Sequence, residues 1–197
     1  MGVKTVTSHS KYLGLPVVFR RSKKEVIAQV VERVWKKIKG WKEKFLSKAK
    51  KEVFIKAVAQ VIPSYIMSFY KIPESICHEI ESMLAKFWWG SKNGERKLHW
   101  MSRGKMEKEK NIGGLGFEVI SEFNTSLIGK QYRCLLTGPY SLVGRVLNGR
   151  YYPRYSIDSS TTGYSPSYSW RNIISSRDLI QKGACWRIGN GEKVSSF

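Results

Sequence analysis

Carboxylates are the residues most able to do chemistry in this chain, because nucleotidyl and phosphoryl transfer require them clustered around metal ions. The two aspartates, Asp158 and Asp178, are isolated in the sequence, and the thirteen glutamates are scattered, mostly beside lysines. No paired-carboxylate motif is present. We therefore expect no polymerase or nuclease activity from this chain alone.

Histidines and cysteines give no stronger signal. None has a nucleophile signature, a CxxC spacing or a metal-ligand spacing beside it, and the three thiols are expected to be reduced core residues of an intracellular protein. These residues are His9, His78, His99, Cys77, Cys134 and Cys185. The cluster Gly113-Gly114-Leu115-Gly116 lacks a phosphate-loop pattern and predicts a turn between modules. We predict no catalytic residue, no metal site and no cofactor.

Positive charge is the dominant feature of the composition. The chain carries 35 Lys and Arg against 15 Asp and Glu, a net charge of +20. The segment from Arg20 to Lys56 alone carries +10. Such an imbalance favours a polyanionic partner, of which nucleic acid is the commonest.

Six cations are the candidates for phosphate contact. Three should share the outward face of one helix, and three crowd the start of the next, where the helix dipole disfavours them. They are Arg33, Lys36, Lys39, Lys48, Lys50 and Lys51. Trp41, between lysines, is a candidate platform for base stacking, whereas Trp35 is placed in the apolar stripe. The alternative is a solvated lysine face without a partner.

The elements that must position these residues are mainly helices. Ser22 and Glu25 form a capping box before a stripe of Val30, Val34 and Ile38, and Gly40 should end or kink that helix. A second helix is expected after Ser47, with a break near Pro63. A third runs from Pro73 to Gly90.

Three further helices are expected after the polar connector. Their approximate ranges are 119–136, 141–151 and 169–181. Gly129, Gly144 and Gly149 lie inside two of them, where each glycine should cost ~1 kcal/mol relative to alanine. The prediction is a mainly α fold, a small helical bundle followed by a second helical module, with short β hairpins at both ends.

Motifs spread along almost the whole chain resemble plant LINE-type (non-LTR) retroelement reverse transcriptases. They occur in the same order as in that family. The matching segments are Lys11-Tyr12-Leu13-Gly14-Leu15-Pro16, Ile62-Pro63-Ser64-Tyr65, Phe87-Trp88-Trp89-Gly90, Gly113-Gly114-Leu115-Gly116-Phe117 and Trp186-Arg187-Ile188-Gly189-Asn190-Gly191.

The resemblance implies a domain order. Residues 1–21 would be a primer-grip hairpin remnant, with Tyr12, Leu13 and Gly14 among the nucleic-acid-binding residues. Residues 22–92 would be the thumb, 93–116 a connector, and 117–197 a helical connecting region ending in a hairpin. The family's palm, which would hold Mg²⁺, has no counterpart here, and Met1 would lie just downstream of it.

The expected function is sequence-tolerant binding of template–primer, RNA or RNA–DNA duplex, through the basic thumb, with no catalysis alone. One alternative is a thumb subunit that joins a palm domain in trans. Another is a domesticated module that binds a protein through its helices. A weaker one is an anionic-membrane binder, although no run approaches the ~20 apolar residues of a membrane span. The expected location is intracellular, in the nucleus or the cytoplasm.

Overall fold

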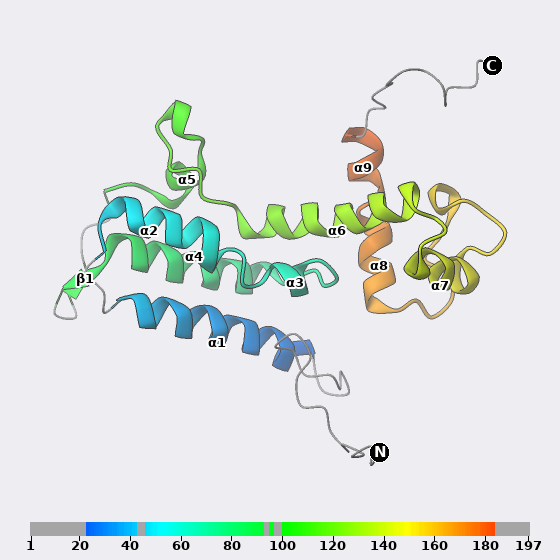
Figure 1. Cartoon of the computed structure of the whole chain (residues 1–197), viewed down its shortest axis with the longest axis horizontal. Coiled ribbons are helices and arrows are strands. Elements are labelled where there is room, and N and C mark those ends of the chain that lie inside the picture. Colours follow the sequence, from blue (N-terminus) through cyan, green and yellow to red (C-terminus); the bar gives the residue numbers. More distant parts are fainter. Residues whose placement is uncertain (1–22, 43–45, 93–94, 97–99, 184–197) are drawn as a thin grey trace, which may run out of the picture. The chain divides into compact units, whose positions relative to one another are not determined.

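The computed structural model describes residues 23–42, 46–92, 95–96 and 100–183 (Figure 1). The chain is mainly α-helical, which confirms the predicted fold class. Contacts divide it into two compact units. Unit 1 holds the described residues up to Met67 together with Ile72–Asn124, and unit 2 holds Ser68–Lys71 together with the described residues from Thr125 onward.

Helix α1 (Lys23–Lys42) begins where the capping signal predicts. Its residues Val30, Val34 and Ile38 are buried, as their helical spacing predicts. Gly40 does not end the helix, which continues to Lys42. A single interior glycine costs only ~1 kcal/mol, and packing of the preceding turns exceeds that cost.

The second predicted helix is divided into three parts. Helix α2 (Lys48–Phe54) starts after Ser47, whose Oγ accepts a hydrogen bond from the Lys50 amide (3.4 Å). It passes into the π-helical turn η1 (Ile55–Ala59), and α3 (Ser64–Met67) follows Pro63. The predicted break at the proline is confirmed, because proline has no amide hydrogen for the helical ladder.

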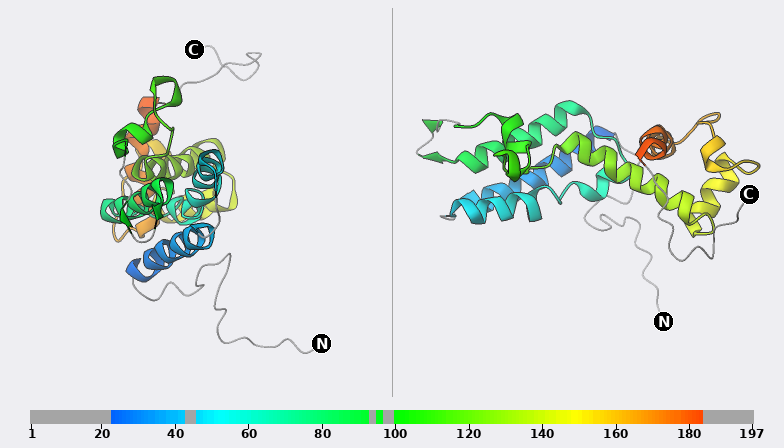
Figure 2. Two further views of the ribbon diagram at one scale, coloured as in Figure 1. Left: turned by 90° about the vertical axis from the view of Figure 1, so that its left-hand side faces the viewer. Right: turned by 90° about the horizontal axis from the view of Figure 1, so that it is seen from above.

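Helix α4 (Glu74–Trp89) is the centre of unit 1. It follows Pro73 and ends at Gly90, as predicted. Helices α1 and α2 both pack against it, and α1 and α4 run side by side in the views of Figures 1 and 2. Its buried residues Ile80, Leu84 and Phe87 form the core with the apolar faces of those helices.

The connector contains structure that the sequence did not predict. Strands β1 (Ser91–Lys92) and β2 (Glu95–Arg96) pair antiparallel, and they are the paired strands within the described ranges. Helix α5 (Arg103–Glu107) and the 3₁₀ turn η2 (Lys110–Ile112) follow. The turn predicted at the glycines is present, and Gly114 lies against the Lys108 carbonyl too closely for any side chain. The hairpins predicted at both chain ends lie outside the described residues.

The first two helices after the connector follow the expected ranges closely, whereas the third expected range, 169–181, is divided into two helices at Ser176. The helices are α6 (Ile120–Thr137), α7 (Leu142–Tyr151), α8 (Tyr168–Ser175) and α9 (Arg177–Gly183), with the 3₁₀ turn η3 (Ile157–Ser159) before α8. The core of unit 2 is aromatic. Trp170 is fully buried and stacks against Tyr151 (4.7 Å between ring centroids) and Tyr152 (5.5 Å).

Residues 68–71 join unit 2 although they lie between two elements of unit 1. The Tyr168 hydroxyl donates to the Lys71 carbonyl (2.9 Å), and Tyr70 stacks on Tyr168 (5.6 Å). On the unit 1 side, the buried Asn124 side chain donates to the Met67 carbonyl and accepts from the Ile72 amide, each at 2.7 Å. The segment 68–71, which we call the excursion, therefore has the residues on both its sides bound by one amide side chain of unit 1, that of Asn124.

Candidate nucleic-acid interface

The predicted cations of α1 lie on its exposed side. Arg33, Lys36 and Lys39 are all exposed, as is Lys37. They lie away from the buried stripe because Val30, Val34 and Ile38 turn the opposite side of α1 toward α4. Lys36 forms an ion pair with Glu32 (2.7 Å) while both side chains remain more than half exposed.

Two lysines of α2 contact the end of α4 rather than solvent alone. The Lys48 ammonium donates to the Trp88 carbonyl (3.2 Å) and lies over the Trp88 and Trp89 rings at 4.6 and 4.9 Å. The Lys51 ammonium reaches the same carbonyl (3.5 Å) and lies over the Phe87 ring. The carboxyl end of a helix is the negative end of its dipole, so these cations stabilise α4.

Lys50 differs from its neighbours because its side chain is exposed and its backbone amide, rather than its ammonium, caps α2. The crowding of cations at the start of α2 therefore has a structural explanation for Lys48 and Lys51. Phosphate contact by Lys50 stays a prediction. Sequence reasoning could not separate the three lysines, because the partner carbonyl lies 37–40 residues away.

The two tryptophans of α1 differ in exposure from what their positions in the sequence indicate, and base stacking by Trp41 stays a prediction. Trp41 is half-buried, and its ring packs on the buried Phe54 (4.8 Å). Trp35, predicted in the buried stripe, is instead 48% exposed. It lines an open apolar groove between α1 and α4 with Val31 and Ile76. The reason is angular: Trp35 lies about 100° from Val34 around the helix, at the border of the buried side.

Tyr12, Leu13 and Gly14, the primer-grip candidates, lie outside the described residues. Their predicted contact with nucleic acid stays a prediction.

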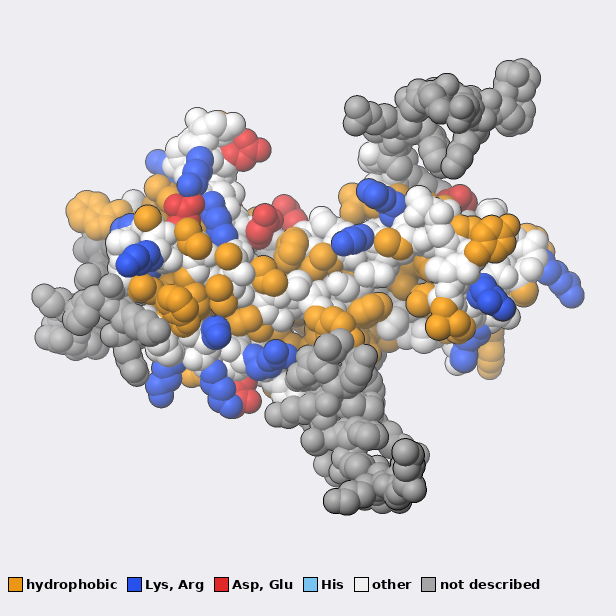
Figure 3. Space-filling model, viewed as in Figure 1, with side chains coloured by type: hydrophobic (Ala, Val, Ile, Leu, Met, Phe, Trp, Pro, Cys, Tyr) orange, Lys and Arg blue, Asp and Glu red, His pale blue; other side chains and the backbone are white. Residues whose placement is uncertain are grey.

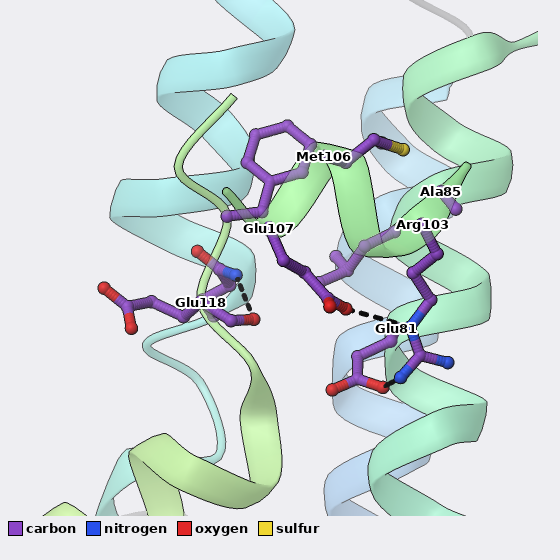
Figure 4. Close-up of a pocket in the computed structure, with 9 residues that line it drawn as sticks. Glu81, Ala85, Arg103, Met106, Glu107 and Glu118 are labelled. Carbon is purple, nitrogen blue, oxygen red and sulfur yellow. Dashed lines mark hydrogen bonds and ion pairs between the residues drawn. The ribbon is translucent and has the colours of Figure 1, made fainter. Parts of the chain in front are cut away.

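A buried carboxylate on α4 was missed by the sequence reasoning (Figure 4). Glu81 is 6% exposed, and it accepts hydrogen bonds from the Arg103 guanidinium and from the Ile120 amide (2.9 Å). Arg103 also pairs with Glu107 (3.0 Å). Because Ile120 is the first residue of α6, Glu81 caps that helix as well as anchoring α5. The adjoining pocket has a volume of about 20 Å³, which is enough for one water-sized group.

Glu52 connects α2 to the connector. Its carboxylate accepts from Lys110 (2.6 Å) and Lys56 (2.9 Å). Both hydrogen bonds favour the ionised form, and they hold the pKa of this carboxyl below its ordinary value.

Two of the three cysteines, Cys77 and Cys134, lie within the described residues, and Cys185 lies outside them. Cys77 is buried as predicted, and burial raises the pKa of its thiol to about 11. Cys134 is exposed, which corrects the prediction of a core position. In the part of the chain that the structure describes, no three His, Cys, Asp or Glu side chains are grouped to hold a metal ion. None of the described helices is both long and apolar enough to cross a membrane.

Fold and surface together define a basic, mainly α protein with two helical units. Comparison with known proteins identifies relatives of the chain. It is 37% identical over 131 residues to the "Uncharacterized mitochondrial protein AtMg00310" of Arabidopsis thaliana, an alignment that covers 66% of this chain and 85% of that protein. The chain belongs to the family of this Arabidopsis protein. No protein-family profile and no solved structure matches it.

A second relative is much longer than this chain. It is the "Putative ribonuclease H protein At1g65750" of Arabidopsis thaliana, 33% identical over 183 residues, and the alignment covers 91% of this chain but only 30% of that protein. Both relatives are plant proteins, and they agree with a plant retroelement-derived protein. They do not single out a reverse transcriptase, since the name of the second relative refers to ribonuclease H.

Proposed function

We propose that the chain is the thumb and connecting part of a plant non-LTR retroelement reverse transcriptase. Its role is to hold template–primer, as RNA or RNA–DNA duplex, through backbone phosphates. The ordered motifs of the sequence support this origin, and the longer relative supports a place within a larger protein. Catalysis, with the Mg²⁺ of the parent family, would belong to a palm domain outside these 197 residues.

The exposed cationic side of α1 is the observation that carries the proposal. Arg33, Lys36 and Lys39 project from a helix whose opposite side is fixed against α4, so the cations have a rigid support. A rigid helix presents charges at constant spacing, which suits the regular phosphates of a duplex. Lys50 adds a fourth exposed cation, whereas Lys48 and Lys51 act chiefly on α4.

Salt-dependent binding tests the proposal. If about four phosphates are neutralised, log affinity for a duplex should fall against log salt with a slope near −4. Replacing Arg33, Lys36 and Lys39 together by alanine should reduce the magnitude of that slope by about three units and weaken all sequences alike. Fluorescence anisotropy of a labelled RNA–DNA duplex at several salt concentrations measures both quantities.

The matched control removes three exposed lysines elsewhere, namely Lys105, Lys108 and Lys130. Lys110 is unsuitable as a control because it pairs with Glu52. Both triple variants lose the same formal charge. Equal losses of affinity in the two would leave net charge as the whole explanation and would overturn the interface on α1.

Trp41 has its own test. If its indole leaves Phe54 to stack on a base, Trp41→Ala should cost ~1–3 kcal/mol of affinity for single strands and leave the salt slope unchanged. A variant that loses stability but not affinity would assign Trp41 to the core alone.

The absence of catalysis is tested by nucleotide incorporation on a primed RNA template with Mg²⁺ or Mn²⁺. We expect none from this chain, and we expect incorporation only when a palm domain is supplied in trans. Incorporation by the purified chain that survives Asp158→Ala and Asp178→Ala would contradict the proposed division of labour.

A further inference from the structure

Helix α7 of unit 2 presents an apolar surface to solvent. Leu142, Val143 and Val146 are 77%, 60% and 61% exposed. The three occupy neighbouring positions on one side of the helix, because residues four apart lie about 40° from each other. Together with Gly149 they make the surface that we call the outward face of α7. Single exposed aliphatic residues are ordinary, but a contiguous set on one helix is typical of an interaction site.

The orientation of this face is fixed by the opposite side of the helix. Gly144 is buried, and a Cβ there would lie 2.5 Å from the Pro139 carbonyl oxygen. The Ser141 side chain caps the helix by accepting from the Gly144 amide (3.1 Å). Leu147 and Tyr151 pack on the core around Trp170. The helix therefore cannot rotate to bury Leu142 and Val146 without losing these contacts.

Arginines border the face, and no acidic residue lies near it in the sequence. Arg145 and Arg150 are exposed on α7, and Arg154 is exposed three residues beyond its end. From Gly138 to Ile157 the chain contains no Asp or Glu. Figure 3 shows hydrophobic side chains beside basic ones over α7. The Arg150 guanidinium lies 5.4 Å from the centre of the Tyr151 ring, which holds it near the helix.

We infer that the outward face of α7 binds an acidic amphipathic helix of a partner protein or domain. The aliphatic centre would bury the apolar stripe of that helix, and its flanking carboxylates would meet Arg145 and Arg150. Gly149 favours a helical occupant, since it is exposed and a Cβ built there would meet nothing within 4 Å, so a second backbone can approach closely.

Other occupants fit the same surface less well. A second copy of this chain would bring its own Arg145 and Arg150 and a net charge of +20 to the contact. Nucleic acid would use the arginines but gain nothing from branched aliphatic side chains, which neither stack on bases nor donate hydrogen bonds. The inference concerns α7 only and does not depend on the proposed duplex binding by α1.

The experiment uses the full chain and a labelled synthetic peptide of about 18 residues, long enough to be helical. It has leucines at helical spacing on one side and glutamates flanking them. A scrambled peptide of the same composition is the control for charge alone. We expect saturable binding of the patterned peptide at least tenfold tighter than of the scrambled one, measured by fluorescence anisotropy.

Two sets of variants locate the binding. Val146→Asp should weaken the patterned peptide at least tenfold, whereas Val53→Asp on α2, at a position 65% exposed, should leave it unchanged. Arg145→Glu with Arg150→Glu should also weaken it, and a peptide with lysines in place of its glutamates should bind that double variant better than the native chain. Thermal melts confirm that each variant is folded.

Several results would overturn the inference. They are equal binding of both peptides, no loss of affinity in Val146→Asp, or no binding of either peptide. A membrane contact is the other result that would overturn it. In that case the chain would bind vesicles of phosphatidylcholine with phosphatidylserine, Val146→Asp would abolish this binding, and the peptide would not bind. Loss of duplex binding in the α1 triple variant with peptide binding intact would show that the two surfaces are separate.

Discussion

Two glycines of α7 have opposite surroundings, and Gly144 departs from the expectation that each interior glycine costs ~1 kcal/mol relative to alanine, whereas Gly149 does not. A Cβ at Gly144 would meet the Pro139 carbonyl, whereas one at Gly149 would meet nothing within 4 Å. Gly129 in α6 is intermediate, since a Cβ there would lie 3.2 Å from the Ile180 side chain. Helix propensity alone treats all three alike, but packing separates them.

Alanine at these positions should therefore change stability in opposite directions. Gly144→Ala should lower the free energy of unfolding by about 1–3 kcal/mol, because the methyl group forces the chain apart at the turn. Gly149→Ala should raise it by about 0.5–1 kcal/mol through better helix propensity. Urea unfolding followed by circular dichroism measures both. Changes of the same sign in the two variants would contradict this explanation.

Glu52 should make part of the stability depend on pH. Its pKa in the folded chain is lowered by Lys110 and Lys56, so the unfolded chain binds its proton more readily. The stabilisation is complete above the ordinary glutamate pKa of roughly 4.3 and declines as the pH falls below it. Glu52→Gln should flatten this acid dependence in urea titrations between about pH 6 and pH 3.

Lys110→Ala removes one of the two lysines that lower the pKa of Glu52. Because Lys110 is the first cause of the lowered pKa and Lys56 the second, its removal should flatten the pH dependence only in part. If the stability of both variants declines with falling pH as it does in the native chain, the two ion pairs do not persist in solution.

Among elements, α2 and α4 depend on each other through two lysines and one carbonyl. Lys48→Ala and Lys51→Ala should each lower the free energy of unfolding by about 0.5–1 kcal/mol, since each loses contact with the end of α4. Lys50→Ala should leave stability nearly unchanged and weaken duplex binding. Denaturant titration and anisotropy on the three single variants separate the two roles. If the three variants weaken duplex binding equally, Lys48, Lys50 and Lys51 would all be phosphate contacts, as the sequence predicts.

The elements that the sequence predicts well are those with long periodic stripes and clear ends. Helices α1, α4 and α6 follow from apolar spacing, Pro73, Gly90 and Gly138. The π-helical turn and the strands of the connector were missed because each is short and lacks a period of its own. The roles of Lys48, Lys51 and Glu81 were missed for another reason: their partners are 37–40, 22 and 39 residues distant, and only the folded chain brings them together.

At the scale of the whole molecule, Asn124 joins residues on both sides of the 68–71 segment. It is 1% exposed, and its hydrogen bonds to Met67 and Ile72 hold the residues on either side of that segment. Asn124→Ala should cost about 2–4 kcal/mol, because a buried amide and a buried carbonyl lose their partners. Ser126→Ala, at an exposed position of the same helix, is the control. Hydrogen exchange should show earlier opening at Ile72 in the Asn124 variant. An unchanged Ile72 amide would contradict the assignment.

The excursion also sets a timetable for synthesis. The Lys71 carbonyl cannot accept its hydrogen bond until Tyr168 has been synthesised, 97 residues later. At ribosomal rates of about 5–20 residues per second, that interval is roughly 5 to 20 s. During it, the segment from Ser68 to Lys71, with its two aromatic rings, leaves the ribosome long before the rest of unit 2 exists. A nascent chain stalled after Lys71 and before Tyr168 would therefore have residues 68–71 without their unit 2 partners. Chaperones would bind the chain in that state.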